Sequence, residues 1–122
     1  MRISSPESLL GHPSLGALFE TLLVNEIKSM STTFDHEPGF YHWRTNGGAE
    51  VDLIIDHNGI LFPIEFKCST QAHKNDLTGI NAFRKAYGDT HTIGPGLIVY
   101  AGDDFWPIDE NAYALPWNWM LI

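Results

Sequence analysis

Two short glycine-containing turns constrain the fold of this chain more than any other feature of its sequence. They are Asn46-Gly47-Gly48 and His57-Asn58-Gly59, and they separate the strand-like segments 40–45 (FYHWRT), 50–55 (EVDLII) and 60–68 (ILFPIEFKC). Asparagine and glycine tolerate the left-handed backbone that tight hairpin turns need. Parallel strands require a long crossover between them. Turns this short therefore predict an antiparallel meander of three strands.

Helical periodicity before and after these strands predicts an α/β fold. Apolar residues recur at helical spacing over 15–30, and again over a second helix at about 76–87. The run 96–101 (GLIVYA) is continuously apolar, which is typical of a strand covered on both faces. The expected element order is αβββαβ, a mixed sheet flanked by helices.

The length of 122 residues fits one domain. We expect residues 1–14 to form a loose lead-in, because serine, proline and glycine punctuate them. Residues 103–122 form a C-terminal extension, of which 113–122 could add a short edge strand or cover the core. Pro63 has no amide hydrogen to donate, so it predicts an unpaired or bulged point in the third strand.

The composition indicates which binding partners and which cell compartment to expect for this chain. Seven basic residues against 15 acidic ones give a formal net charge of −8, which disfavours strong binding of nucleic acid by this chain alone. No apolar run reaches the ~18 residues of a membrane span. Cys68 is the single cysteine, which is consistent with a reducing cytosol, and we expect a cytoplasmic protein.

Charged side chains collect on one face of the second and third predicted strands. Because side chains alternate along a strand, Glu50, Asp52 and Ile54 should share one face, and Glu65 and Lys67 should share one face of the next strand. Pairing around the second turn would place Asp52 beside Glu65. Adjacent carboxylates repel unless a cation lies between them, and Mg²⁺ accepts such oxygen ligands.

These residues predict a site for phosphodiester hydrolysis that uses Mg²⁺ or Mn²⁺. Asp52 and Glu65 would be metal ligands, and Lys67 would position a water or stabilise the phosphorane transition state. Glu20, on the first helix, would supply a further carboxylate ligand, although Glu26 competes with it for an inward position. The alternative interpretation of Glu65 and Lys67 is a solvated surface pair.

The same residues carry a resemblance to known families. Asp52, twelve intervening residues and Glu65-Phe66-Lys67 resemble the active-site signature of the PD-(D/E)XK nuclease superfamily. The amino-acid sequences of four segments are similar to the C-terminal domain of unknown function that follows the ATPase module of many prokaryotic AAA-type ATPases. The segments are 16–20 (GALFE), 41–45 (YHWRT), 48–52 (GAEVD) and 63–67 (PIEFK). The resemblance implies a restriction-endonuclease-like fold with Glu20, Asp52, Glu65 and Lys67 at the matching positions.

Two functions follow from this resemblance. The first is a metal-dependent nuclease domain, with DNA as the expected substrate. The second is a catalytically inactive interaction module, the tail of an AAA-type ATPase, which the acidic surface and the apolar residues 117–122 favour. The sequence has no GxxxxGK[ST] motif, so ATP binding is not implied and we expect a detached or truncated domain. Because the chain is acidic, we expect it to need an ATPase-domain partner or a homo-oligomer to hold nucleic acid.

Overall fold

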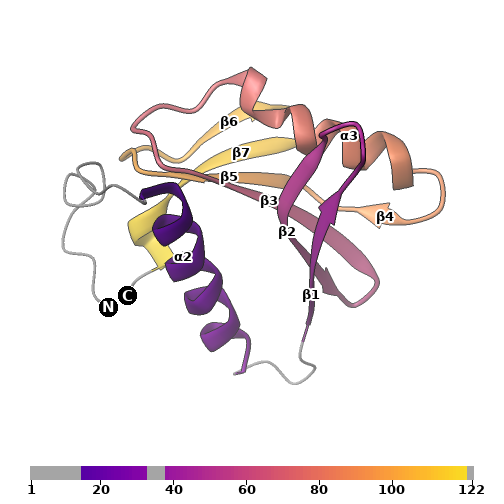
Figure 1. Cartoon of the computed structure of the whole chain (residues 1–122), viewed down its shortest axis with the longest axis horizontal. Coiled ribbons are helices and arrows are strands. Elements are labelled where there is room, and N and C mark those ends of the chain that lie inside the picture. The colour runs from indigo at the N-terminus through magenta and orange to yellow at the C-terminus, as the bar shows by residue number, and fades with distance from the viewer. Residues whose placement is uncertain (1–14, 33–37, 121–122) are drawn as a thin grey trace.

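The structure is a computed structural model that describes residues 15–32 and 38–120 (Figure 1). The expected lead-in of residues 1–14 lies outside the described residues. The helices are α2 (Leu15–Ser31) and α3 (Thr78–Tyr87), with the 3₁₀ turns η1 (Lys74–Leu77) and η2 (Trp117–Met120). The strands are β1 (Gly39–Arg44), β2 (Glu50–His57), β3 (Ile60–Lys67), β4 (Thr92–Ile93), β5 (Gly96–Tyr100), β6 (Trp106–Asp109) and β7 (Ala112–Pro116).

The strands form one seven-stranded mixed sheet in the order β1-β2-β3-β5-β7-β6, with the short β4 also beside β3. The predicted meander is confirmed, because β1, β2 and β3 pair antiparallel. Asn58 and Gly59 connect β2 to β3 with positive φ angles of 54° and 81°, as a two-residue type I′ turn requires. The chain then crosses through α3 and returns as β5, parallel to β3. The predicted α/β class is therefore confirmed.

The C-terminal part of the sheet differs from the prediction. Strand β7 pairs in parallel with β5 and antiparallel with β6, so it is an inner strand and β6 is the edge. Ala112 and Ala114 of β7 are buried in the core cluster that also contains Ile80 and Phe83 of α3. Periodicity did not reveal β4 and β6, which have two and four residues and are too short to show a repeat.

Pro63 lies where the third strand changes partner. Leu61 is the last residue of β3 that pairs with β4, and Ile64 is the first that pairs with β5. On the other side Pro63 faces Ile54 of β2 in regular register. The strand is thus unpaired at Pro63 on one side only, and no bulge forms in β3.

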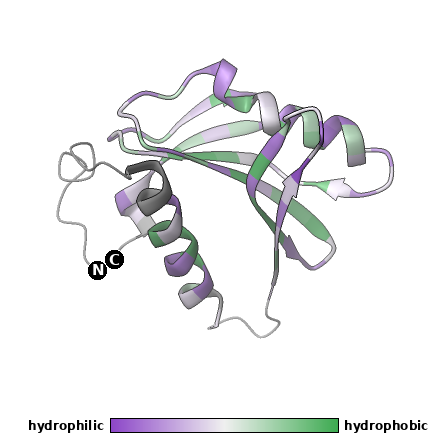
Figure 2. Ribbon diagram, viewed as in Figure 1, coloured by the Kyte–Doolittle hydropathy of each residue, from purple (hydrophilic) through white to green (hydrophobic). Residues whose placement is uncertain are grey.

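The two helices cover opposite faces of the sheet (Figure 1). The apolar strand residues in Figure 2 are shared between two core clusters, one on each face. On one face Ile80 and Phe83 of α3 pack with Val51 and Ile54. On the other face the residues that pack together are Leu23 and Ile27 of α2, Leu53, Ile64, Val99 and Trp117. Burying each side chain of this size stabilises the fold by roughly 2 kcal/mol.

Helix α3 approaches the start of β2 closely. A Cβ atom at Gly79 would overlap the carbonyl oxygen of Glu50. Glycine at this position therefore lets the helix backbone rest directly on the strand that carries Asp52. Among the described residues, no helix has the length and apolar character needed to cross a membrane.

Candidate functional site: a carboxylate pair at a strand fork

A β-bulge in β2 determines where Asp52 points. Tyr41 of β1 faces Ile54 of β2, and Trp43 faces Val51. One residue of β1 and two residues of β2, the first of which is Asp52, lie between these pairs. A bulge of this kind interrupts the alternation of side chains and re-aims them.

The bulge corrects the predicted distribution of side chains along β2. Ile54 packs on the α3 face together with Val51, whereas Leu53 packs on the α2 face. Asp52 also lines a cavity on the α2 face. The expectation that Asp52 and Ile54 share a face was therefore wrong, because the extra residue shifts the period of two at this point.

The carboxyl groups of Asp52 and Glu65 meet where β2 and β3 separate. The last regular pair of the two strands is Leu53 with Ile64. Beyond it, the backbone N–H of Asp52 donates to Glu65 Oε1 (3.0 Å), and the N–H of Phe66 donates to Asp52 Oδ2 (2.9 Å). The predicted closeness of Asp52 and Glu65 is confirmed. We call this arrangement of Asp52 and Glu65 the strand fork.

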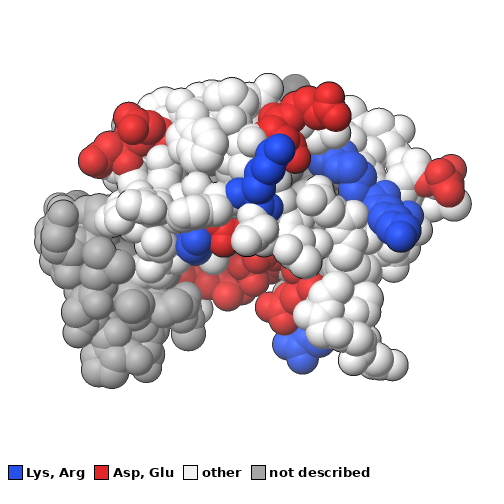
Figure 3. Space-filling model, turned by 90° about the horizontal axis from the view of Figure 1, so that it is seen from above, with Lys and Arg blue, Asp and Glu red and all other residues white. Residues whose placement is uncertain are grey.

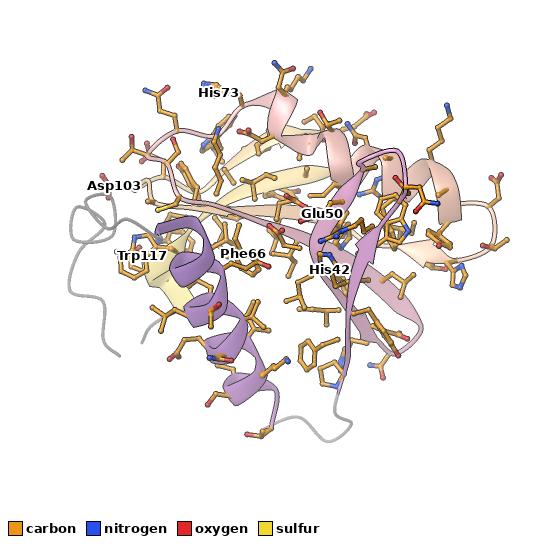
Figure 4. The ribbon with its side chains drawn as sticks, in the orientation of Figure 1. His42, Glu50, Phe66, His73, Asp103 and Trp117 are labelled. Atoms are coloured by element: carbon orange, nitrogen blue, oxygen red, sulfur yellow. The ribbon has the colours of Figure 1, made fainter. Side chains whose placement is uncertain are left out.

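The two carboxylates reach the strand fork from opposite faces of the sheet. Glu65 lies toward α3, since its Oε1 would be 3.6 Å from a Cβ at Gly79. Asp52 lies toward α2. Figure 4 shows Phe66 between β3 and α2, and His42 and Glu50 on the neighbouring strands β1 and β2. The opening between the strands thus lets side chains from both faces meet.

Burial and like charge keep a proton in the strand fork. Removal from water, followed by the negative charge of Asp52, raises the pKa of Glu65 to about 8. Burial also raises the pKa of Asp52, although the hydrogen bond from the Phe66 N–H opposes this shift. The like charges of the two carboxyl groups therefore make it unfavourable for both to ionise together.

Glu20 extends the acidic group from helix α2. Burial raises its pKa, and the charges of Asp52 and Glu50 add to this effect. Glu20 lines the cavity between α2 and the first two strands, and Glu26 does not. The structure therefore favours Glu20 over its competitor for an inward position.

The cavity beside the strand fork is about 330 Å³ and is lined by both acidic and basic side chains. Glu20 and Lys28 line it from α2, and His42 and Asp52 line it from β1 and β2. The Lys28 ammonium lies 6.0 Å from the centre of the Phe40 ring. The remaining lining residues are Val24, Tyr41 and Leu53.

Lys67 has a partner that the sequence analysis missed. Its Nζ donates to Asp76 Oδ2 at 2.7 Å, and the backbone N–H of His73 donates to the same oxygen at 2.7 Å. Asp76 therefore caps η1 and holds the Lys67 ammonium at the start of this turn. An aspartate in the first turn of a helix is a common capping signal, and that signal could have identified it. Another acidic residue, Glu50, pairs at the surface with Arg44 (3.5 Å).

The carboxylates of Asp52 and Glu65 suit a metal ion whose remaining coordination positions are filled by water or substrate. Among the described residues, no three histidine, cysteine, aspartate or glutamate side chains are placed to hold a metal ion together. Mg²⁺ is commonly bound by one or two carboxylates, with waters and substrate phosphates as its other ligands. Asp52 and Glu65 supply two carboxylates, and the negative charge of Asp52, which helps to raise the pKa of Glu65, would also attract a cation.

These features define an α/β domain with a mixed sheet and a carboxylate pair in a fork between two strands. Comparison with protein families identifies the chain more closely: residues 15–120 match the domain of unknown function DUF4143. The chain belongs to this family, whose domain is commonly found with AAA ATPases. No curated protein and no solved structure matched the chain.

Proposed function

We propose that this domain is a divalent-cation-dependent nuclease, in which Asp52 and Glu65 hold Mg²⁺ or Mn²⁺ and Glu20 assists them. The observation that carries this proposal is the partly buried carboxylate pair of the strand fork, in which burial and the charge of Asp52 raise the pKa of Glu65. A bound divalent ion supplies Lewis-acid activation of a phosphodiester. The resemblance to the PD-(D/E)XK signature supports the assignment of nucleic acid as the substrate.

Residues of the chain would have separate tasks in this reaction. Asp52 and Glu65 would hold the cation as carboxylates, so a proton on either group would have to leave, because a ligand must be deprotonated. Lys67 follows Glu65 by two residues on β3, and it must leave Asp76 to reach a phosphate. Lys28 and His42 line the same cavity as Glu20 and Asp52, where they can contact a phosphate oxygen.

A cleavage assay tests the proposal. We expect cleavage of DNA in Mg²⁺ or Mn²⁺ and its loss in EDTA, with single- and double-stranded DNA and RNA as substrates. Lys67→Ala should lower the rate at least about 100-fold, as loss of a transition-state contact does. Lys85→Ala removes an exposed lysine of α3 and should leave the rate unchanged. Equal rates in the two variants, or no cleavage by the original chain, would overturn the proposal.

A second candidate function is a protein-interaction module, and an exposed aromatic stack favours it. The ring of Phe105 stacks on Tyr113 (5.4 Å between centroids) and on Trp119 (5.5 Å). Phe105 and Trp119 are 46% and 52% exposed, which is unusual for side chains so apolar. A surface that binds a nucleic-acid backbone usually carries a continuous stripe of basic side chains. On the face shown in Figure 3, Lys and Arg side chains form separate groups and not such a stripe. If millimolar Mn²⁺ leaves the melting temperature unchanged, the module is favoured over the nuclease.

A further inference from the structure

A second cavity, of about 290 Å³, lies on the α3 face; Tyr41 and His42 also line the cavity beside the strand fork, and Asp52 and Glu65 do not line this one. It opens between β1, β2 and the second half of α3. Aromatic side chains form most of its wall, and Ile54 and Leu61 contribute aliphatic surface. The aromatic and imidazole groups are Tyr41, His42, Trp43, Phe83, Tyr87 and His91. We call it the aromatic pocket.

The rings of the aromatic pocket stand at steep angles to one another. Trp43 and Tyr87 have centroids 6.1 Å apart and planes inclined at 78°, and Tyr87 and His91 are 5.8 Å apart at 80°. Trp43 also meets Phe83 edge to face at 5.4 Å. Perpendicular rings turn their faces in different directions. A group among them can therefore meet the negative face of one ring and the side of another.

One carboxylate, Asp56, completes the lining of the aromatic pocket. Asp56 is half-buried, and within residues 15–32 and 38–120 its side chain has neither a hydrogen bond nor an ion pair. In the sheet register it faces Gly39, over which the Tyr41 ring lies. A Cβ at Gly39 would be only 3.0 Å from two atoms of the Tyr41 side chain, ring atom Cε2 and the hydroxyl oxygen Oη. The missing side chain at Gly39 thus makes room for Tyr41 beside Asp56.

An unpaired carboxylate among aromatic rings favours a cationic ligand. Cations are attracted to the faces of aromatic rings, and the carboxylate adds a direct charge interaction. The formal net charge of −8 adds a general attraction for cations. The small volume limits the ligand to a compact group. We propose that the aromatic pocket binds a small quaternary or alkylated ammonium compound, independently of the nuclease function proposed above.

Choline and its neutral isostere, 3,3-dimethylbutan-1-ol, test this assignment in the intact chain. They have the same shape and differ in charge, so titration followed by calorimetry and ligand-observed NMR separates cation recognition from apolar burial. We expect saturable choline binding, at least about fivefold tighter than that of the isostere. Equal affinity of the two compounds, or no saturable binding of choline, would overturn the proposal.

Two variants assign the binding to this cavity. Asp56→Asn and Tyr41→Leu should each weaken choline binding about fivefold or more. Tyr41 is 57% exposed, so its replacement should leave the fold intact, and a thermal melt verifies this. Glu110→Gln, at an exposed position between β6 and β7, is the matched control and should bind choline normally. Unchanged affinity in both pocket variants would refute the site. If the pocket binds a lysine-containing peptide but not choline, the proposal that its ligand is a small free ammonium compound is refuted.

Discussion

Replacing Glu65 by glutamine should stabilise the metal-free domain above about pH 6. The pKa of Glu65 is about 8 in the folded chain and 4.5 as its ordinary value. Below pH 4.5 both states are protonated, and the contribution of this group is complete. Between 4.5 and 8 the unfolded chain loses its proton first, so the free energy of unfolding falls as the pH rises. Glu65→Gln removes this titration and keeps an oxygen that accepts the hydrogen bond from the Asp52 N–H.

The size of the effect follows from the two pKa values. Their difference corresponds to at most about 5 kcal/mol, at about 1.4 kcal/mol for each tenfold change in the proton equilibrium. Glu65 is only half-buried, and water screens part of its interaction with Asp52. We therefore expect a loss of about 2 kcal/mol between pH 5 and pH 8. For a domain of this length, that corresponds to roughly 5–10 °C in melting temperature.

Thermal and urea denaturation in EDTA at pH 5, 6.5 and 8 measures this effect. The original chain should lose stability across this range, and Glu65→Gln should lose much less of it. Glu110→Gln, an exposed carboxylate outside the strand fork, should follow the original chain. The reasoning is refuted if Glu65→Gln and the original chain have the same pH dependence. It is also refuted if the glutamine variant is the less stable of the two at pH 8.

Two further predictions concern the same part of the molecule. Mn²⁺ should raise the melting temperature of the original chain more at pH 8 than at pH 6, because protonation of Glu65 competes with metal binding. Calorimetry in two buffers should detect the released proton, and equal shifts in melting temperature at both pH values would contradict this competition. Gly79→Ala should destabilise the fold by about 2 kcal/mol or more in urea denaturation, because its Cβ would overlap the Glu50 carbonyl and force α3 away from β2. The control is Ala82→Gly, at a half-buried position in the same helix, which should lower the free energy of unfolding by about 1 kcal/mol through helix propensity. If Gly79→Ala lowers it by less than this control, the helix can shift to accommodate the Cβ.

The sequence by itself determined the elements that depend on local chemistry. The turn at Asn58-Gly59 requires a left-handed backbone, which few other residue pairs tolerate, so it determined the β2–β3 hairpin. Apolar spacing determined both helices. The same hairpin was sufficient to predict that Asp52 and Glu65 would be neighbours.

Only the tertiary structure decided how the candidate site is oriented. The bulge that turns Asp52 toward α2 arises from the pairing of β2 with β1, which places two residues opposite one. The contact of Lys67 with Asp76 needs η1 to pack at the end of β3. The inner position of β7 likewise depends on its pairing with β5 and β6. Each of these features depends on contacts between segments distant in the chain, whereas periodicity and turn chemistry report on neighbouring residues alone.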